Sequence, residues 1–287
     1  MSKTIYIKTF GCQMNVYDSE RILQSVNKTH TQVKNPENAD AILLNTCHIR
    51  EKAAEKVYSE IGMFNNLKKK KKDLKIVVAG CVAQAEGKAM LIRQPIIDAI
   101  IGPQMYQYLP EVLSEKINRK NIFLEFKEEE KFESLGTRRI KAEISSFITI
   151  QEGCDKFCSF CVVPFTRGAE FSRPVSDIIE EAKSLVEMGT KEVILLGQNV
   201  NAYNGKNFNN EAFSLAQLIL ELEKINNLER ISYTTSHPRD MSNELINLHS
   251  ISEKLNPYLH LPVQSGSDLV LKNMNRKYTS TEYLKII

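Results

Sequence analysis

The chain has 287 residues, which is enough for one large domain or two ordinary ones with their own hydrophobic cores. Its composition, 42% hydrophobic and 25% charged, is that of a globular protein, and a net charge of +3 argues only weakly for a nucleic-acid partner. Because no apolar run of membrane-spanning length and no signal-peptide core is present, we expect a cytoplasmic protein whose cysteines serve metal binding or catalysis.

The first part of the chain alternates short apolar strands with amphipathic helices. The predicted strands are residues 4–10, 41–46, 75–80 and 96–102. The predicted helices are a segment that begins with Asp18 as its N-cap, residues 51–67 and a helix near 110–117. This order predicts a parallel, doubly wound sheet in residues 1–125, and we interpret the lysine run 68–72 as a solvated loop.

Residues 126–141 interrupt the alternation with charges and a glycine, and we interpret them as a linker. In residues 142–287 the alternation begins again. The predicted strands are residues 146–151, 192–198, 230–236 and 258–264, and the predicted helices are about 176–188, 214–225 and 241–251. Repeated βα units predict a barrel or partial barrel, in which functional sites lie at the carboxyl ends of the strands.

Three cysteines each stand directly after a predicted strand of the first region: Cys12, Cys47 and Cys81. Because the carboxyl ends of parallel strands lie along one edge of the sheet, we expect the three thiols to converge there. Gly11 and Gly80 precede two of them and would let the backbone approach a bulky group. The alternative is three small buried side chains, but the pattern favours a metal cluster.

A second set of cysteines, Cys154, Cys158 and Cys161, is packed into eight positions after the first strand of the second region. A structural zinc site needs a fourth ligand, and the nearest histidines, His48 and His237, are remote in sequence. Soft thiolates also bind iron–sulfur clusters, and three of them on a cubane leave one iron open to a substrate. The spacing therefore favours an iron–sulfur cluster, with zinc as the alternative.

The segments around both sets of cysteines resemble those of the radical S-adenosylmethionine (SAM) methylthiotransferases. Within this family they look most like the group that acts on N6-dimethylallyladenosine in bacterial tRNA. The segments are "TFGCQMNVYDSE", "LLNTCHIREKAAEKVY", "VAGCVAQ", "EGCDKFCSFCVVPFTRGAEFSRP", "LLGQNVNAY", "TTSHPRDMS" and "HLPVQSGSDLVLKNMNRKYT". They follow one another from Lys8 to about Tyr283, so the resemblance covers nearly the whole chain.

The resemblance implies two [4Fe-4S] clusters and SAM as cofactors. Cys154, Cys158 and Cys161 would bind the cluster that holds SAM at its open iron. Cys12, Cys47 and Cys81 would bind an auxiliary cluster that supplies or relays sulfur. The implied reaction is radical 2-methylthiolation at C2 of the modified adenosine next to the anticodon, chemistry that requires a cofactor. Residues 1–125 would then be the methylthiotransferase domain and 142–287 the radical SAM core.

Further residues are predicted to bind the cofactor: Phe157, Phe160, Arg167, Gln198, Asn199, Gln264 and Ser265. The two phenylalanines would pack over the cluster or the adenine, with ordinary core packing as the alternative. Arg167, like Lys156 and Arg173, would meet a phosphate or the SAM carboxylate, or else be solvated. The four polar residues follow predicted barrel strands, where SAM would lie. No residue is assigned as catalytic, and His237 is as easily structural.

The resemblance also implies partners: a tRNA anticodon stem-loop, an electron donor such as flavodoxin or ferredoxin, and no membrane, with a monomeric chain. Alternatives are a methylthiotransferase for threonylcarbamoyladenosine in tRNA or for a ribosomal protein, and, from another class, a non-catalytic iron–sulfur-binding fragment. The family's chains continue past Ile287. We therefore expect a truncated barrel of about four strands without the C-terminal TRAM domain. Such a chain is expected to bind tRNA poorly and to be only marginally soluble.

Overall fold

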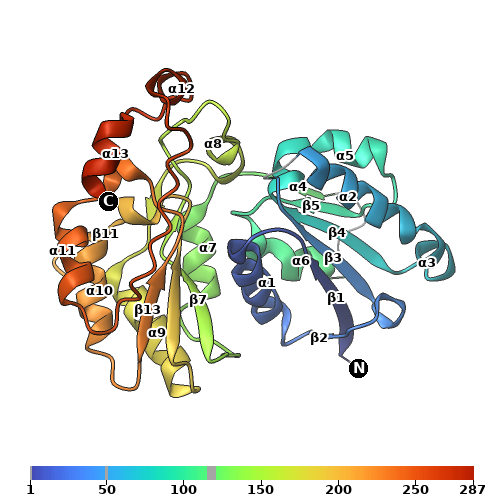
Figure 1. Cartoon of the computed structure of the whole chain (residues 1–287). Coiled ribbons are helices and arrows are strands. Elements are labelled where there is room, and N and C mark those ends of the chain that lie inside the picture. The colour runs from blue at the N-terminus through green and yellow to red at the C-terminus, as the bar shows by residue number, and fades with distance from the viewer. Residues whose placement is uncertain (1, 49–50, 115–120) are drawn as a thin grey trace. The chain divides into compact units, whose positions relative to one another are not determined.

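The computed structural model describes residues 2–48, 51–114 and 121–287, and the chain divides into two units. The first unit comprises Met1–Leu135 and Phe165–Arg167, and the second comprises Gly136–Pro164 and Gly168–Ile287. Each unit has its own parallel sheet and its own hydrophobic core (Figure 1). The domain boundaries expected from the sequence stay a prediction.

Within the described residues, the first unit is built on a six-stranded parallel sheet of order β2-β1-β3-β4-β5-β6. The strands are β1 (Lys3–Thr9), β2 (His30–Gln32), β3 (Ala41–Thr46), β4 (Lys75–Gly80), β5 (Ala99–Ile101) and β6 (Asn121–Phe123). Along β3, Ile42 and Leu44 belong to one core and Leu43 to the other, since successive side chains point to opposite faces. The sheet is therefore buried on both faces, which confirms the predicted doubly wound α/β fold.

Helices cover each face of this sheet (Figure 1). One core contains residues of α1 (Gln13–Val26) and α6 (Leu109–Leu113), and the other contains residues of α2 (Glu51–Met63), α4 (Cys81–Glu86) and α5 (Lys88–Arg93). The other helical segments are η1 (Pro36–Asn38), α3 (Asn65–Lys70), η2 (Tyr106–Tyr108) and α7 (Glu128–Leu135). In the helix predicted at 51–67, the apolar side chains at helical spacing are buried: Ala54, Val57, Tyr58, Ile61 and Phe64. Of the helix predicted near 110–117, residues 115–117 lie outside the described part.

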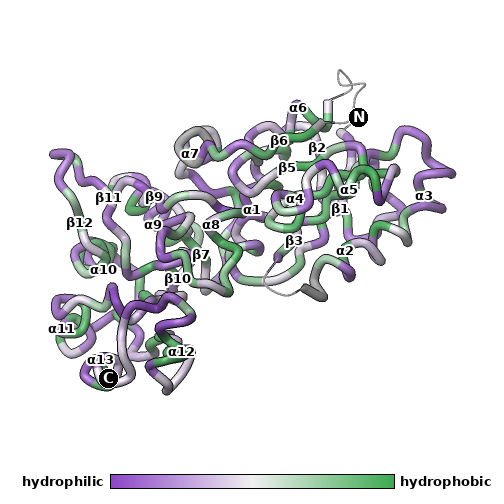
Figure 2. Tube along the Cα trace, turned by 90° about the horizontal axis from the view of Figure 1, so that it is seen from above, coloured by the Kyte–Doolittle hydropathy of each residue, from purple (hydrophilic) through white to green (hydrophobic). Residues whose placement is uncertain are grey.

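Two sequence predictions in this unit are wrong in whole or in part. Asp18 does not cap a helix, because α1 begins after Cys12 and the Asp18 carboxylate is fully buried among cationic side chains. The lysine run is only in part a loop, because Lys68–Lys70 form the end of α3 and Lys68 Nζ lies 2.7 Å from Asp98 Oδ2, whereas residues 71 and 72 lie outside the helix. Figure 2 shows α3 as a largely hydrophilic segment. The short strands β2 and β6 were not predicted.

The second unit contains, in its described residues, a three-stranded parallel sheet of order β13-β10-β7. Its strands are β7 (Ser145–Thr149), β10 (Glu192–Leu196) and β13 (Arg230–Tyr233). The helices α9 (Val175–Glu187), α10 (Leu215–Glu223) and α11 (Asn243–Ile251) follow the predicted pattern and contribute to the core. The smaller elements are β8 (Gln151–Glu152), β9 (Phe171–Ser172), η3 (Val200–Ala202), β11 (Asn204–Lys206), β12 (Ala212–Ser214), η4 (Pro238–Asp240), α12 (Asp268–Asn273) and α13 (Ser280–Ile286). The helix α8 (Val163–Arg167) begins in the second unit, and its residues Phe165–Arg167 belong to the first.

The fourth barrel strand predicted at 258–264 does not form, so the expectation of about four strands is also wrong. The chain touches β13 through a single parallel bridge between Ile231 and Leu255, and the Ser236 amide donates to the His260 carbonyl. Pro262 has no amide hydrogen for a ladder, and Gln264 has a φ of 73°, which ends extended backbone. The segment 256–266 is consequently an irregular loop beside the sheet.

The predicted linker 126–141 contains the helix α7, and Lys131 and Phe132 within it are buried in the first unit. A charged sequence looked like a linker because its ionic partner, Asp18, lies more than a hundred residues away in the chain. None of the helices in the described part of the chain has the length and apolar character needed to cross a membrane.

Candidate metal centres

The first set of cysteines stands at the carboxyl ends of adjacent strands. Cys12 follows β1, Cys47 follows β3 and Cys81 follows β4, and these three strands are neighbours in the sheet. The strand order changes direction between β1 and β3, and open α/β sheets bind ligands at such a topological switch point. The topology therefore brings the three residues to the one edge where this fold offers a ligand site. That they bind a cluster stays a prediction.

Two glycines let these strand ends approach one another. Gly11 has a φ of 98°, and a Cβ there would lie 2.2 Å from Cys47 Cβ and 2.7 Å from Cys47 Sγ. Gly80 has a φ of 91°, and its Cβ would lie 2.3 Å from the Thr46 carbonyl oxygen. The sequence suggested that these glycines make room for a bulky group. In the structure the closest neighbour of each is the adjacent strand end that carries Cys47.

The surroundings of Cys12 favour its thiolate form. The Cys47 side chain hydrogen-bonds to it and lowers the pKa of Cys12 to about 6, against the opposing effect of burial, with further help from the Asn15 amide and the charge of Arg167. Cys12 also occupies the N-cap of α1, where a thiolate faces the positive end of the helix dipole. A thiol that ionises this readily is suited to ligate a metal.

A buried ionic group lies beside this thiol in the first unit. Asp18 Oδ1 is 3.2 Å from Lys131 Nζ and Asp18 Oδ2 is 2.8 Å from Arg167 Nη2, and all three side chains are at most 3% exposed. Arg167 Nη2 also lies 3.5 Å from Asn15 Oδ1, and the Arg167 carbonyl accepts from Gln104 Nε2. Arg167 is therefore not solvated, and its predicted role as a cofactor ligand stays a prediction.

The second set of cysteines lies in the loop between β8 and α8. The loop begins at Gly153, whose φ of 73° and close approach to the Ala169 carbonyl leave no room for a Cβ. Its backbone is fixed by two glutamines, because Gln198 Oε1 accepts from the Gly153 amide at 2.6 Å and Gln151 Nε2 donates to the Gly153 carbonyl at 2.7 Å. The predicted cofactor residue Gln198 thus holds the start of the cysteine loop.

Burial opposes ionisation of two thiols in this loop. It raises the pKa of Cys154 to about 11, against the lowering effect of the Lys156 amide, and it raises the pKa of Cys161, against the Val163 amide. A bound metal reverses this balance because a coordinating thiol is deprotonated outright. Three soft thiols on one short loop are the donor set of an iron–sulfur cluster, so the residues fit that group.

Unpartnered polar atoms lie at the carboxyl ends of β10 and β13. Asn199 Oδ1, Ser236 Oγ and His237 Nε2 are buried and have no hydrogen-bond partner among the described residues. Asn199 Nδ2 donates to Asp240 Oδ2, whose other oxygen lies 2.8 Å from Lys156 Nζ in the cysteine loop. Buried polar groups are normally paired. These atoms therefore fit a polar ligand such as SAM, which carries both donors and acceptors.

Glu170 adds a titratable carboxyl to this group. Burial raises the pKa of Glu170 to about 7, with the charge of Asp240 in the same direction and that of Lys156 opposing it. Asn199 hydrogen-bonds to the same carboxyl. Neither Glu170 nor Asp240 belongs to a spacing pattern, so the sequence alone did not indicate a role for them. Their proximity arises only when the segments after β8, β10 and β13 fold together.

The other predicted cofactor residues are placed differently. Phe157 and Phe160 are 55% and 52% exposed, so ordinary core packing is excluded and stacking on a ligand stays a prediction. Gln264 and Ser265 do not follow a strand, because residues 258–264 form none, which removes the reason for choosing them. Arg173 is buried against Glu181 at 2.9 Å and the Thr149 carbonyl, and so serves the packing of α9.

Across the described ranges, no group of three or more His, Cys, Asp or Glu side chains is close enough to hold a single metal ion. Whether Cys154, Cys158 and Cys161 bind an iron–sulfur cluster or zinc stays a prediction.

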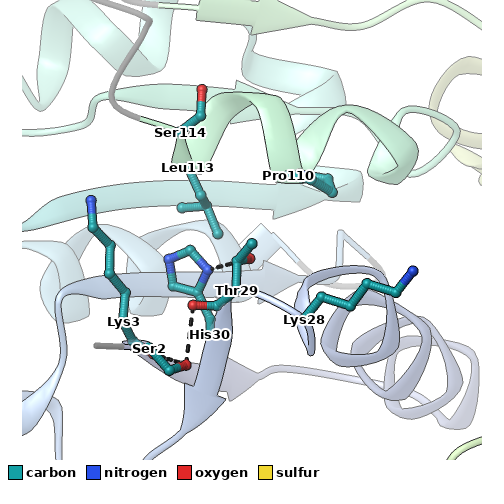
Figure 3. Close-up of a pocket in the computed structure, with 8 residues that line it drawn as sticks. All are labelled: Ser2, Lys3, Lys28, Thr29, His30, Pro110, Leu113 and Ser114. Carbon is teal, nitrogen blue, oxygen red and sulfur yellow. Dashed lines mark hydrogen bonds between the residues drawn. The ribbon is translucent and has the colours of Figure 1, made fainter.

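A pocket of about 470 Å³ lies at the opposite, amino-terminal edge of the first sheet (Figure 3). It is lined by Ser2, Lys3, Lys28, Thr29, His30, Pro110, Leu113 and Ser114. The Thr29 hydroxyl and His30 Nδ1 lie 2.9 Å apart in its wall. Because β1 and β2 begin here and Cys12, Cys47 and Cys81 follow the other ends of their strands, this pocket is not part of the site of the first cysteine set.

Comparison with known proteins defines the class. Residues 4–102 match the Uncharacterized protein family UPF0004, and residues 148–287 match the Radical SAM superfamily. The fold agrees with the solved structure of the radical SAM methyltransferase TsrM from Kitasatospora setae, with a TM-score of 0.65 at 12% identity over 99% of this chain and 65% of that one. The chain is a radical SAM protein with an N-terminal UPF0004 domain.

Curated proteins of one name are similar to almost the whole of this chain. The tRNA-2-methylthio-N(6)-dimethylallyladenosine synthase of Ruegeria sp. (strain TM1040) is 57% identical over 99% of this chain and 65% of its own length. Synthases of the same name from Rickettsia bellii and Jannaschia sp. are 55% and 53% identical over the whole of this chain and 66% and 62% of their own. The chain is therefore similar to these synthases over nearly its whole length and spans just under two thirds of theirs.

Proposed function

We propose that this protein is a tRNA methylthiotransferase that adds a 2-methylthio group to N6-dimethylallyladenosine next to the anticodon. The observation that carries the proposal is the presence of two separate sets of three cysteines, one after the parallel strands β1, β3 and β4 and one in the loop after β8, in a chain 53–57% identical to synthases of that reaction. Its cofactors would be two [4Fe-4S] clusters and SAM, and its partners the tRNA and an electron donor such as flavodoxin or ferredoxin.

Cys154, Cys158 and Cys161 would hold the cluster that binds SAM. Bound there and reduced, the cluster and SAM supply a radical that removes hydrogen from an unactivated carbon, which side-chain acids and bases cannot do. The chain's own part is orientation. Gln151 and Gln198 fix the first turn of the loop through Gly153.

The unpartnered atoms of Asn199, Ser236 and His237 would satisfy their hydrogen-bonding needs on SAM, since buried polar atoms without partners are costly. Lys156 and Asp240 form an ion pair 2.8 Å long next to Asn199 and would present charge to the amino-acid end of SAM. The exposed rings of Phe157 and Phe160 would cover the adenine or the substrate base by stacking.

Cys12, Cys47 and Cys81 would hold the auxiliary cluster from which the sulfur is delivered. The low pKa of Cys12 means that this ligand is already ionised near neutral pH. Arg167 and Asn15 keep the thiolate side of the site polar, while Gly11 and Gly80 keep the strand ends close enough for three sulfurs to meet one group.

The test is anaerobic reconstitution with iron, sulfide, a reductant, SAM and tRNA that carries dimethylallyladenosine. We expect release of 5′-deoxyadenosine and formation of the 2-methylthio product. Cys158→Ala should abolish SAM cleavage, and Cys47→Ala should keep SAM cleavage but lose thiolation. Ser159→Ala, an exposed neighbour in the same loop, is the matched control and should keep both.

Full thiolation by Cys47→Ala would contradict the role of the second cysteine set. Clusters without SAM cleavage would leave an iron–sulfur-binding protein instead of an enzyme. Product on threonylcarbamoyladenosine tRNA or on a ribosomal protein, with none on dimethylallyladenosine, would assign the chain to another branch of the family.

A further inference from the structure

A buried arginine contacts the central cysteine of the second set. Arg276 is 5% exposed and its Nη1 lies 3.2 Å from Cys158 Sγ. The other two donors point at neutral oxygens, since Nε lies 3.2 Å from the Tyr278 hydroxyl and Nη2 3.3 Å from the Pro262 carbonyl. The guanidinium also lies 5.4 Å from the centre of the Tyr278 ring.

This cation has no carboxylate partner within the described residues. Every contact of Arg276 given above is to a thiol, a hydroxyl, a carbonyl or an aromatic ring. Arginine stays protonated in proteins, and a buried charge without a counter-charge is expensive. Among its neighbours, Cys158 is the group that becomes anionic, and it does so when it ligates a metal.

The backbone around Arg276 holds the same loop in place. The Ser159 amide donates to the Met274 carbonyl at 3.1 Å, and Asn275 Nδ2 donates to the Lys156 and Phe157 carbonyls at 3.3 and 2.8 Å. Asn275 has a φ of 57° and Phe157 a φ of 48°, conformations that non-glycine residues adopt at a cost and keep when neighbouring contacts determine them. The segment 274–276 therefore fixes the backbone of the loop by hydrogen bonds on both sides of Cys158.

The three thiols of the set are consequently unequal. Cys154 and Cys161 receive hydrogen bonds from backbone amides of Lys156 and Val163, whereas Cys158 receives a charged side-chain donor. Charge-assisted hydrogen bonds are stronger than neutral ones, and hydrogen bonds to cluster sulfurs help to set reduction potentials.

We propose that Arg276 is a positioning residue that supplies the counter-charge of the Cys158 thiolate in the cluster and raises the cluster's reduction potential. The proposal rests on the proposed function, because it requires Cys154, Cys158 and Cys161 to bind a cluster. A positive charge on a ligand sulfur stabilises the reduced form, which carries one more negative charge than the oxidised form. Arg276 thus eases acceptance of the electron that SAM cleavage needs.

The experiment uses the full chain with Cys12→Ala, Cys47→Ala and Cys81→Ala, so that one cluster remains. The protein is reconstituted anaerobically and its potential is measured by redox titration of the EPR signal of the reduced cluster. Arg276→Gln should shift the midpoint to a more negative value and lose iron faster to a chelator. Arg276→Lys should lie between Arg276→Gln and the parent. Lys277→Gln removes an adjacent exposed charge and should change neither reading.

An Arg276→Gln protein that keeps its cluster at the parent potential overturns the inference while leaving the proposed function intact. If Arg276→Gln retains no cluster, Arg276→Lys decides: a shifted midpoint supports the inference and an unchanged one overturns it. A parent protein that binds no iron overturns the proposed function, and the inference with it.

Discussion

Single glycines determine how closely the strand ends of the first unit approach. Gly80 has a φ of 91°, and a Cβ there would lie 2.3 and 2.9 Å from the Thr46 backbone oxygen and nitrogen and 2.8 Å from Asn45 Oδ1. Its lack of a side chain is therefore required twice, by conformation and by space. Gly11 has the same two requirements against Cys47. These residues act on the cysteine set through the positions of the turns and not by binding anything themselves.

We predict that Gly80→Ala destabilises the metal-free protein by at least roughly 1–3 kcal/mol, the cost of a strained backbone, because the new Cβ would also press on the Thr46 carbonyl. The measurement is urea unfolding followed by circular dichroism. Gly62→Ala is the control, since no atom lies within 4 Å of a Cβ there and the site is helical. It should stabilise by about 0.5–1 kcal/mol. Equal stability of the two variants would contradict this account.

His237 makes stability depend on pH. Burial, and then the charge of Arg276, lower the pKa of His237 from 6.5 to about 4, so it stays neutral in the folded protein. As pH falls, the unfolded chain takes up the proton first. The contribution of His237 to the free energy of unfolding is therefore fully present above pH 6.5. It is lost as pH falls from 6.5 to about 4, and it does not change further below that pH.

For His237 the expected loss in unfolding free energy between about pH 7.5 and pH 5 is roughly 2 kcal/mol. Burial also lowers the pKa of His30 and His249, so other histidines add to the fall in the same direction. His237→Gln should reduce the fall by roughly 2 kcal/mol. Urea midpoints at the two pH values check this, and an undiminished fall in the variant would count against it.

The cysteines and the arginine differ in how far sequence alone could reveal them. Cys12, Cys47 and Cys81 each follow a strand, and parallel strands align their ends, so local patterns sufficed to place them together. The contact of Arg276 with Cys158 joins residues 118 positions apart and depends on two left-handed backbone conformations. No spacing or periodicity encodes such a contact, although Arg276 lies within a segment that resembled the family.

Helices α1 and α7 are joined by buried charge instead of apolar packing alone. Asp18 on α1 meets Lys131 on α7, and the carboxylate is shared with Arg167. This explains why the charged segment 126–141 was interpreted as a linker: its lysines look solvated until the opposite charge is placed beside them. The prediction of a strand at 258–264 was wrong for a related reason. A strand forms only beside another strand whose backbone N–H and C=O groups are unpaired, and an apolar run in the sequence does not show whether such a strand is present.

We predict that Asp18→Asn lowers the free energy of unfolding by about 3–5 kcal/mol, because it removes the buried carboxylate that both Lys131 and Arg167 contact. The control is Glu55→Gln, which breaks an ion pair with Arg93 whose side chains are 67% and 50% exposed. Exposed pairs contribute less than about 1 kcal/mol, so the control should change little. Urea denaturation measures both, and a similarly small effect of Asp18→Asn would refute the structural role of the group.

Each of the two units of the chain contains one set of three cysteines. In the first unit the cysteines stand in three separate turns after parallel strands, and in the second they lie in a single loop after the short strand β8. The compact loop was recognisable from its spacing, and the dispersed set only from the strand pattern. Each set offers three ligands where a cubane cluster has four irons, so each leaves one position for a non-protein ligand.

This arithmetic gives a prediction for the metal content. The reconstituted wild-type chain should bind about eight irons, and each triple variant about four. The variants are Cys12→Ala with Cys47→Ala and Cys81→Ala, and Cys154→Ala with Cys158→Ala and Cys161→Ala. Iron and acid-labile sulfide assays provide the counts. Only the variant that keeps the second set should respond to SAM in its EPR spectrum, because its open iron would be the one that binds SAM. About four irons in the wild type, lost completely with one triple variant, would show a single cluster and refute the assignment of the other set.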